Sequence, residues 1–544
     1  MPSISLRRTD PEWAWESKKK SCAAEGSELK TSPADGLAVS THLLPTVPET
    51  SGTLAFPGNV ARVRQSIWRK IFSFPVLLAL SLGASIFVFD SGSIADPDIW
   101  WHLRNAEVFV QTHSVVRHDV YSFTAAGSRW INEAWLSELP YYFAWQWLGI
   151  RGIYLVMLVE VELILLGVFG LACLESRNVK AAFCASWLAV WLATVSFGPR
   201  TLLAGWMCLV AELFLLAQFK RGKDRLWLLP PLFALWANLH GSWLIGMVLF
   251  GIFCASGLAQ GTWGRLQATR WTRAQFRKLA LVGRLSVAGL FLNPYTYHLV
   301  FYPFNFAFKQ RLNANHVDEW MSLDFHGVRG KILFAILAAT IVLALVRQQR
   351  WQLHELAFTI LGFYAAVTYS RFLFLAAIVV TPMLARELDF FTTYRREIDK
   401  PALNAALMLA IILGCILRFP GRTYLMRDTV RNYPVQALSH LQRFHPEGRV
   451  FNDCLWGGYL IWNARHIPVF IDSRIDIFEY NGVFADYLDA MGGKNTMEVL
   501  DKYRIRYVLF PQNSPVAYLL MHNPGWKTDY QDGVAVLLER AITP

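Results

Sequence analysis

Two aspartates, Asp96 and Asp98, stand one residue apart in the stretch "IADPDIWWHL", and His102 follows four residues later. A carboxylate can act as a general base, and two carboxylates together can help to bind a divalent cation. The pair follows an apolar run that ends at Phe89, so we expect it to emerge near a membrane surface. The D-x-D spacing is also common by chance, and Pro97 could simply open a helix that Asp96 caps.

Other polar residues that are costly in lipid also stand at the ends of apolar runs. An arginine there can offer planar donors to a phosphate, and a histidine can orient a substrate or donate a hydrogen bond. The alternatives are an arginine that only reaches the lipid headgroups and a histidine that only completes a turn. The candidates for substrate binding are Arg200, Asn238, His240, Asp318, Glu319 and Arg371.

The composition indicates a membrane protein. Of the 544 residues, 54% are hydrophobic and only 17% are charged, and the mean hydropathy is positive. The formal net charge of +12 does not predict a nucleic-acid partner, because basic residues in membrane proteins crowd the cytoplasmic loops. The seven cysteines show no C-x-x-C spacing, so neither a zinc site nor a disulfide framework is indicated.

About eleven apolar runs are long enough to be transmembrane helices. The stretch "LPP" in the fifth run indicates a broken or tilted helix, so the count could differ by one. The runs lie at 71–89, 152–173, 181–198, 201–219, 226–238, 242–259, 279–298, 331–346, 354–370, 372–386 and 403–418.

Lysine and arginine predict the orientation of these helices. If the N-terminus is cytoplasmic, the inner loops hold more than twice as many basic residues as the outer loops. We therefore expect a multi-pass protein of the inner cell membrane, with a disordered cytoplasmic tail at 1–68 and no cleavable signal peptide. An odd number of helices then places the C-terminal region outside the cytoplasm.

Two outer regions are large. Residues 90–150 form the first outer loop, in which the stretch beginning at Glu133, "EAWLSELPYYFAWQWLG", predicts an interfacial helix. Trp100 and Trp101 are expected to anchor this loop at the membrane surface. Residues 428–544 predict a small α/β domain, with strands at "GRVFND", "IPVFIDSR", "RYVLFP" and around "KTDYQDGVAVLLER", and with "LWGGYLIWNA" as a helix. The fold class is therefore an α-helical polytopic membrane domain (69–427) followed by an extracytoplasmic α/β domain.

In this topology all the candidate residues fall at the outer face, beneath the C-terminal domain. Carboxylates, imidazoles and two arginines that converge there would suit a transferase that uses a polyprenyl-phosphate sugar. Asp96 or Asp98 would deprotonate the acceptor or help to bind a divalent cation. Arg200 and Arg371 would hold the phosphate.

As a set, the motifs resemble those of the GT-C superfamily of polytopic glycosyltransferases, and most closely a large bacterial group of mostly uncharacterised membrane proteins. The resemblance covers residues 70–540. It is carried by "DPDIWWHLRNAE", "VVRHDVYSFTAAGSRWINEAWLSEL", "FALWANLHGSWLIG", "LNPYTYHLV", "VDEWMSLDFH", "YSRFLFLAAIVVTP" and "GRVFNDCLWGGYLIWNARHIPVFIDSRIDIF".

The resemblance implies an acidic residue in the first outer loop as catalytic base or metal ligand, and Asp96 matches that position best, with Asp98 close behind. It also implies a large first outer loop with interfacial helices, and basic residues that bind the donor phosphate. The partners would be a polyprenyl-phosphate-linked sugar, a glycan, lipid or protein acceptor, and the bilayer. No cofactor is certain, and a divalent cation on Asp96 and Asp98 is the one candidate.

Two features of the C-terminal region have alternative interpretations. "LWGGYLIW" faintly resembles the "WWDYG" motif by which oligosaccharyltransferases recognise the acceptor peptide, but it lacks the aspartate, which puts that role for Trp456 in doubt. Asp453, Asp472, Arg474 and Asp476 could border an acceptor cleft. We favour the simpler interpretation that Arg474 pairs with Asp472 or Asp476 and fixes a turn.

The leading hypothesis is a glycosyltransferase that moves a sugar from a polyprenyl-phosphate donor to an extracytoplasmic acceptor, with Asp96, Asp98 and His102 as catalytic residues. A transporter or lipid flippase would have polar residues at both faces and often inverted repeats, and the sequence shows neither. A non-catalytic assembly protein that keeps the same fold is the second alternative, and it could retain the same aspartates.

Overall fold

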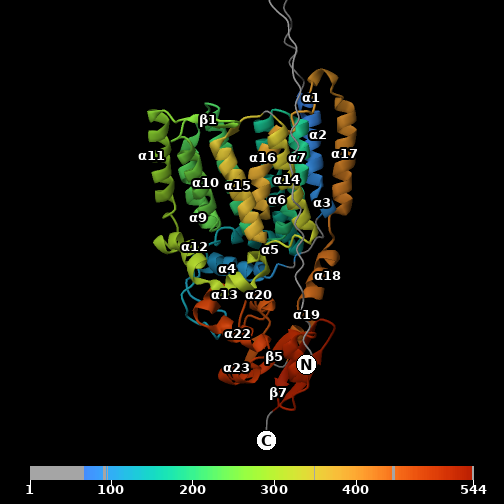
Figure 1. The fold of residues 1–544 in the computed structure, drawn as a ribbon. Helices are drawn as coiled ribbons and strands as arrows, with labels where there is room; N and C mark the ends of the chain where they lie inside the picture. Colours follow the sequence, from blue (N-terminus) through green and yellow to red (C-terminus); the bar gives the residue numbers. More distant parts are fainter. Residues whose placement is uncertain (1–66, 90–93, 95, 348, 444–446, 542–544) are drawn as a thin grey trace, which may run out of the picture. The chain divides into compact units, whose positions relative to one another are not determined.

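The structure is a computed structural model that describes residues 67–89, 94, 96–347, 349–443 and 447–541. Apart from Ile67 and Trp68, the predicted tail at 1–68 lies outside the described residues. Between residues 67 and 541 the chain forms a helical domain followed by a small sheet domain (Figure 1). The predicted order of a helical membrane domain and a C-terminal α/β domain is confirmed, and the side of the membrane on which the second domain lies stays a prediction. The predicted boundary between residues 427 and 428 falls inside a helix, α18 (Arg422–Asn432).

Every predicted apolar run coincides with a helix. The prolines of "LPP" stand in the first turn of α9, where a missing N–H costs nothing, and mark a break after the preceding short helix. The helices are α2 (Phe74–Ala84), α3 (Ile86–Phe89), α6 (Ile150–Ser176), α7 (Val179–Ala193), η1 (Thr194–Ser196), α8 (Leu202–Lys220), η2 (Leu226–Leu228), α9 (Leu229–Leu239), α10 (Trp243–Ser256), α11 (Arg273–Gly289), α14 (Val328–Val346), α15 (Leu353–Thr368), α16 (Leu373–Glu387) and α17 (Pro401–Arg418).

Within the described residues, five of these helices are long and apolar enough to cross a membrane, and four shorter apolar segments accompany them. The chain is therefore a multi-pass membrane protein, and the number of crossings stays a prediction. At the centre, α16 packs against α6, α7 and α15 and is buried on nearly all sides, which explains its uniformly apolar sequence (Figure 1). By contrast, α17 exposes most of its apolar side chains, as a lipid-facing helix does.

Shorter helices connect and cap the long ones. In the first outer loop, the predicted interfacial helix begins at Glu138 and not at Glu133, because residues 133–137 form turns. The remaining helices are α1 (Ile67–Ile71), α4 (Asp98–Thr112), α5 (Glu138–Leu148), α12 (Tyr297–Lys309), α13 (Arg311–His316), η3 (Asp318–Trp320), η4 (Ser370–Phe372), η5 (Arg396–Ile398), α19 (Val435–Arg443), α20 (Cys454–Asn463), α21 (Ile475–Tyr480), α22 (Val483–Met491), α23 (Thr496–Lys502) and α24 (Pro515–Met521).

The strands form two sheets. In the C-terminal sheet the order is β4-β5-β7-β6, with β4 parallel to β5 and the other neighbours antiparallel. The second, smaller sheet joins the loop after α10 to the start of α15. The strands are β1 (Gly261–Trp263), β2 (Leu266–Ala268), β3 (Trp351–Gln352), β4 (Arg449–Asn452), β5 (Ile505–Pro511), β6 (Trp526–Gln531) and β7 (Ala535–Arg540).

The prediction of a sheet strand at "IPVFIDSR" is wrong. This segment is extended, but its only ladder contact among the described residues is an isolated parallel bridge between Val469 and Ser122 of the first outer loop. The N–H and the carbonyl of Val469 bond to Tyr121 and Phe123 in that loop. The next two residues are held by the side chain of Asn452, which accepts from the Phe470 N–H at 2.8 Å and donates to the Ile471 carbonyl at 2.8 Å. A buried amide therefore takes the place of a neighbouring strand.

Candidate functional site

One cavity of about 680 Å³ lies between the outer loops and the C-terminal domain. Its lining side chains come from the start of α4, the loops before α5 and α8, the residue after α9, from α12, η3 and η4, and from the turn before α21. Of the predicted site residues, those that line it are Asp96, Asp98, His102, Arg200, His240, Asp318, Glu319 and Arg371. The structure therefore brings together eight of the nine residues that the sequence singled out.

Asp96 forms an ion pair with Arg200, whose Nε lies 2.7 Å from Asp96 Oδ2. The other oxygen, Oδ1, accepts the Asp98 N–H at 3.0 Å. The N-cap of α4 is Pro97 and not Asp96, so the alternative in which Asp96 caps the helix is wrong. Burial raises the pKa of Asp96 to about 6, although the Arg200 charge acts in the opposite direction. At neutral pH the carboxyl is therefore mostly ionised and can still accept a proton at little cost.

Two arginines line this part of the cavity, and their environments differ. Arg200 bridges two carboxylates, because its Nη1 also donates to Glu319. The Arg371 guanidinium stacks 4.2 Å above the Trp320 ring and, among the described residues, forms no ion pair with a carboxylate. Arg371 therefore keeps its planar donors available for an anion in the cavity.

His240 is a neutral hydrogen-bond donor. Burial lowers its pKa to about 3, and the nearby Arg371 charge acts in the same direction. Its Nδ1 accepts the Ser242 N–H at 3.0 Å, so the single proton of the neutral ring is on Nε2. That nitrogen lies 4.0 Å from Glu133 Oε1 at the cavity wall.

His102 and Asp98 are each held by a neighbour. Glu138 Oε1 lies 2.8 Å from His102 Nδ1 and also accepts from Asn132 and Asn105. Asp98 Oδ1 accepts the Trp101 indole N–H at 3.1 Å. These hydrogen bonds fix the orientation of both side chains before any ligand binds.

Asn238 does not line the cavity. Its amide nitrogen donates to the carbonyls of Ala234 at 2.8 Å and Leu292 at 2.9 Å, and its oxygen accepts from Trp135 at 3.0 Å. Asn238 therefore joins α9 to the first outer loop and to the segment after α11. We leave it out of the substrate site.

The prediction that Trp100 and Trp101 anchor the first outer loop in the membrane is wrong. Their side chains are buried, with exposed fractions of 2% and 7%. Trp100 packs edge-on against Tyr459 of the C-terminal domain at 5.2 Å, and Trp101 donates to Ser473 at 3.0 Å. The two tryptophans therefore pack against the C-terminal domain.

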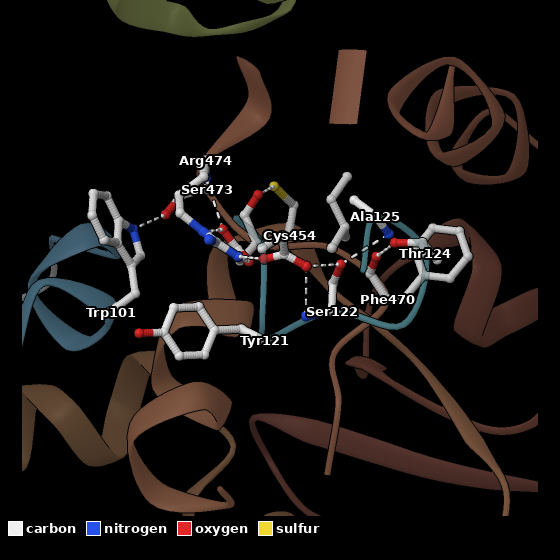
Figure 2. Close-up of polar contacts among 12 residues, drawn as sticks. Trp101, Tyr121, Ser122, Thr124, Ala125, Cys454, Phe470, Ser473 and Arg474 are labelled. Carbon is white, nitrogen blue, oxygen red and sulfur yellow. Dashed lines mark hydrogen bonds and ion pairs between the residues drawn. The ribbon is translucent and has the colours of Figure 1, made fainter. Parts of the chain in front are cut away.

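The interpretation that Arg474 pairs with Asp472 is confirmed, and the pair has a third member. Arg474 donates to Asp472 through Nε at 2.7 Å and Nη2 at 2.6 Å, and its Nη2 also donates to Asp119 of the first outer loop at 2.7 Å. The guanidinium lies over the rings of Tyr121 and Trp130. Figure 2 shows Arg474 beside Ser473, which meets Trp101. This buried cluster joins the C-terminal domain to the first outer loop.

Sequence reasoning missed Glu133 and Tyr302, which line the cavity together with Asp476. Tyr302 donates to Asp476 Oδ2 at 3.0 Å. Burial raises the pKa of Glu133 to about 7, and the charge of Asp476 adds to this; burial likewise raises the pKa of Asp476 to about 7. The available signal is that Glu133 is the first residue of the stretch predicted as an interfacial helix, next to Asn132 in "WINEAW".

The carboxylates near α4 do not form a ready metal site. Both oxygens of Asp96 are engaged, one by Arg200 and one by the Asp98 N–H. Among the residues with described positions, no group of three or more His, Cys, Asp or Glu side chains is arranged to hold a metal ion. The donor set thus fits an arginine better than a divalent cation, which usually needs several oxygen ligands.

No protein-family model and no curated protein matches this chain. The solved structures that are similar to it include two with 13% sequence identity and a TM-score of 0.50 each. One is the Archaeoglobus fulgidus oligosaccharyltransferase tethered to an acceptor peptide, where the match covers 82% of this chain and 69% of that one. The other is ArnT from Cupriavidus metallidurans bound to undecaprenyl phosphate, where it covers 88% and 99%. The chain therefore shares its fold with both of these structures, and this agrees with the fold that the sequence resemblance implies.

Proposed function

We propose that this protein is a glycosyltransferase that moves a sugar from a polyprenyl-phosphate donor to an acceptor outside the cytoplasm. The observation that carries the proposal is the meeting of Asp96, Arg200 and Arg371 in one cavity, where Arg371 has no carboxylate partner within the described part of the chain. A base and a phosphate-binding cation are the two groups that this transfer requires. The similar structures support the proposal through their fold, and one of them holds undecaprenyl phosphate.

In the proposed reaction the acceptor's hydroxyl or amide group loses its proton to Asp96. The acceptor atom forms a bond to the anomeric carbon of the sugar, and the bond between that carbon and the phosphate oxygen breaks. Polyprenyl phosphate leaves with one more negative charge than it had in the donor. Arg371, together with Arg200 and the Nε2 proton of His240, would stabilise this charge.

Asp98, His102 and Glu319 act around this centre in the proposal. Glu319 shares Arg200 with Asp96, so it holds the guanidinium against the base. Asp98 and His102 are oriented by Trp101 and Glu138 and would contact the sugar or the acceptor. Asp318 lines the same wall and would bind the substrate there.

The proposed location is the inner cell membrane, with the N-terminus in the cytoplasm and the C-terminal domain outside. The bias of lysine and arginine along the sequence supports this orientation. Reporter enzymes fused after residue 541 and in the loop between α8 and α9 test it. Activity of a periplasmic reporter at the C-terminal fusion is expected, and activity of only a cytoplasmic reporter there would overturn the orientation.

The enzyme activity is tested by incubating the purified protein in lipid nanodiscs with radiolabelled polyprenyl-phosphate glucose, mannose or N-acetylglucosamine and with membrane extract as acceptor. We expect transfer by the wild type and a loss of at least about 100-fold in Asp96→Asn, as for removal of a general base. Asp224→Asn is the control, because Asp224 pairs with Lys278 away from the cavity. Undiminished transfer by Asp96→Asn would remove Asp96 from the mechanism.

A further inference from the structure

The motif "WGGY" (Trp456–Tyr459) lies in α20, and this helix packs against α4, which carries Asp98 (Figure 1). Besides the packing of Trp100 on Tyr459, the two segments meet through the backbone at Gly458. A Cβ atom on Gly458 would lie 2.5 Å from the carbonyl oxygen of Pro97, whereas ordinary contacts begin near 3.4 Å. Only glycine therefore lets α20 approach the turn between the two aspartates this closely.

Gly457 likewise allows a close approach of α20 to the segment on its other side, which holds Ile471 and Asp472. A Cβ atom there would lie 2.3 Å from the Ile471 carbonyl oxygen and 2.5 Å from the Asp472 Cα. Asp472 is the residue that fixes Arg474 and, with it, the Ser473 hydroxyl that accepts from Trp101. The two adjacent glycines thus hold α20 between the start of α4 and the buried ion cluster.

The two aromatic residues of the motif act on the same turn. The Tyr459 ring stacks on Tyr433 at 5.0 Å, and the Tyr433 hydroxyl donates to the Asp96 carbonyl at 3.1 Å. Trp456 donates through its indole N–H to the Asn432 carbonyl at 2.8 Å, which fixes the residue before Tyr433. Gly458 therefore contacts the turn of the aspartate pair directly, and Tyr459 contacts it through Tyr433. Trp456 and Gly457 support the turn through longer chains of contacts.

We infer that "WGGY" is a positioning motif, which sets the Asp96–Pro97–Asp98 turn for catalysis and does not recognise the acceptor. This inference rests on the proposed function. Neither Trp456 nor Tyr459 lines the cavity, and their exposed fractions are only 5% and 7%, so an acceptor in the cavity does not reach them. The C-terminal domain is then part of the catalytic machinery through this contact.

The test compares Gly458→Ala with Gly251→Ala, a matched helical substitution in α10 with no atom within 4 Å of the new Cβ. In Gly458→Ala the turn must move by about 0.9 Å to restore ordinary contact, and a misplacement of about 1 Å can cost about 100-fold in rate. We expect kcat for transfer to fall about 10- to 100-fold while KM for the polyprenyl-phosphate sugar changes less than about 3-fold. Gly251→Ala keeps both constants.

A second measurement needs no substrate. Hydrogen–deuterium exchange of the peptide that covers residues 96–103 is expected to become at least about 10-fold faster in Gly458→Ala and to stay unchanged in Gly251→Ala. If Gly458→Ala does not fold, Tyr433→Phe removes only the hydroxyl that donates to the Asp96 carbonyl, and a fall of about 3- to 10-fold in kcat is expected.

The outcomes separate the inference from the function on which it rests. If Gly458→Ala keeps the wild-type kcat and the wild-type hydrogen–deuterium exchange rate, the positioning role is overturned. Where Gly458→Ala does not fold, the same result in Tyr433→Phe overturns it. Both results leave the function intact provided that Asp96→Asn abolishes transfer. A raised acceptor KM with unchanged kcat in Trp456→Phe would instead assign the motif to acceptor recognition. No transfer by the wild type with any of the donors overturns the function itself.

Discussion

Replacing Arg474 by methionine removes the central cation of the cluster that joins the C-terminal domain to the first outer loop. The exposed side-chain fractions of Arg474, Asp472 and Asp119 are 1%, 0% and 0%. Methionine fills a similar volume but leaves two buried carboxylates with no cation beside them. Breaking a buried ion pair by removing one partner typically costs about 3–5 kcal/mol, so we expect a loss of this size in the free energy of unfolding.

The pH dependence of this variant has a definite sign. Burial already raises the pKa of Asp472 above its ordinary value, despite the Arg474 charge, and removal of that charge raises it further. A group whose pKa is higher in the folded than in the unfolded state stabilises at low pH and loses that contribution as the pH rises. Arg474→Met is therefore expected to be most destabilised near neutral pH and partly recovered near pH 5.

The assay is thermal unfolding of the protein in detergent at pH 5 and pH 7.5, combined with limited proteolysis that detects release of the C-terminal domain. Arg465→Met is the matched control, because Arg465 also joins the C-terminal domain to α4, through Glu107, but its side chain is 48% exposed. An exposed pair contributes at most about 1 kcal/mol. Equal stability of the two variants, or no recovery at pH 5, would refute the buried-cluster account.

Three more predictions concern the cavity and Asn238, which lies outside it. Arg371→Gln should weaken the binding of fluorescent polyprenyl phosphate about 10- to 100-fold, measured in nanodiscs, whereas Arg329→Gln, outside the cavity, should not. Because burial raises the pKa of Glu133 to about 7, the wild type should lose stability relative to Glu133→Gln as the pH rises from 5 to 8 in thermal unfolding; a constant difference would contradict this. Asn238→Leu should destabilise by about 1–3 kcal/mol and leave polyprenyl-phosphate affinity unchanged, and weakened binding in a folded variant would return Asn238 to the site.

The apolar runs predict the helices well, because a chain in lipid must satisfy its backbone hydrogen bonds within each segment. The same pattern predicts three polar side chains of the cavity wall. Arg200, His240 and Arg371 each stand where an apolar run ends, and ends on one side of a membrane lie at one level. Their convergence in a single cavity follows from how the helices pack, which spacing alone does not determine.

The errors occur where tertiary contacts override local pattern. Trp100 and Trp101 have the composition of an interfacial anchor, but a separate domain covers them. The segment around Val469 has the composition of a buried strand, yet its hydrogen bonds go to the first outer loop and to the Asn452 side chain. Glu133 fits the polar face of a helix in sequence, and only the turns at 133–137 direct it into the cavity.

The central claim is that the cavity beneath the C-terminal domain binds the phosphate of a lipid-linked sugar beside Asp96. The most direct measurement is a cryo-electron microscopy structure of the protein in nanodiscs with undecaprenyl phosphate. The account predicts the phosphate within hydrogen-bonding distance of the Arg371 guanidinium, in the cavity that Asp96 and Arg200 line. A phosphate bound elsewhere, with this cavity filled only by water, would contradict it.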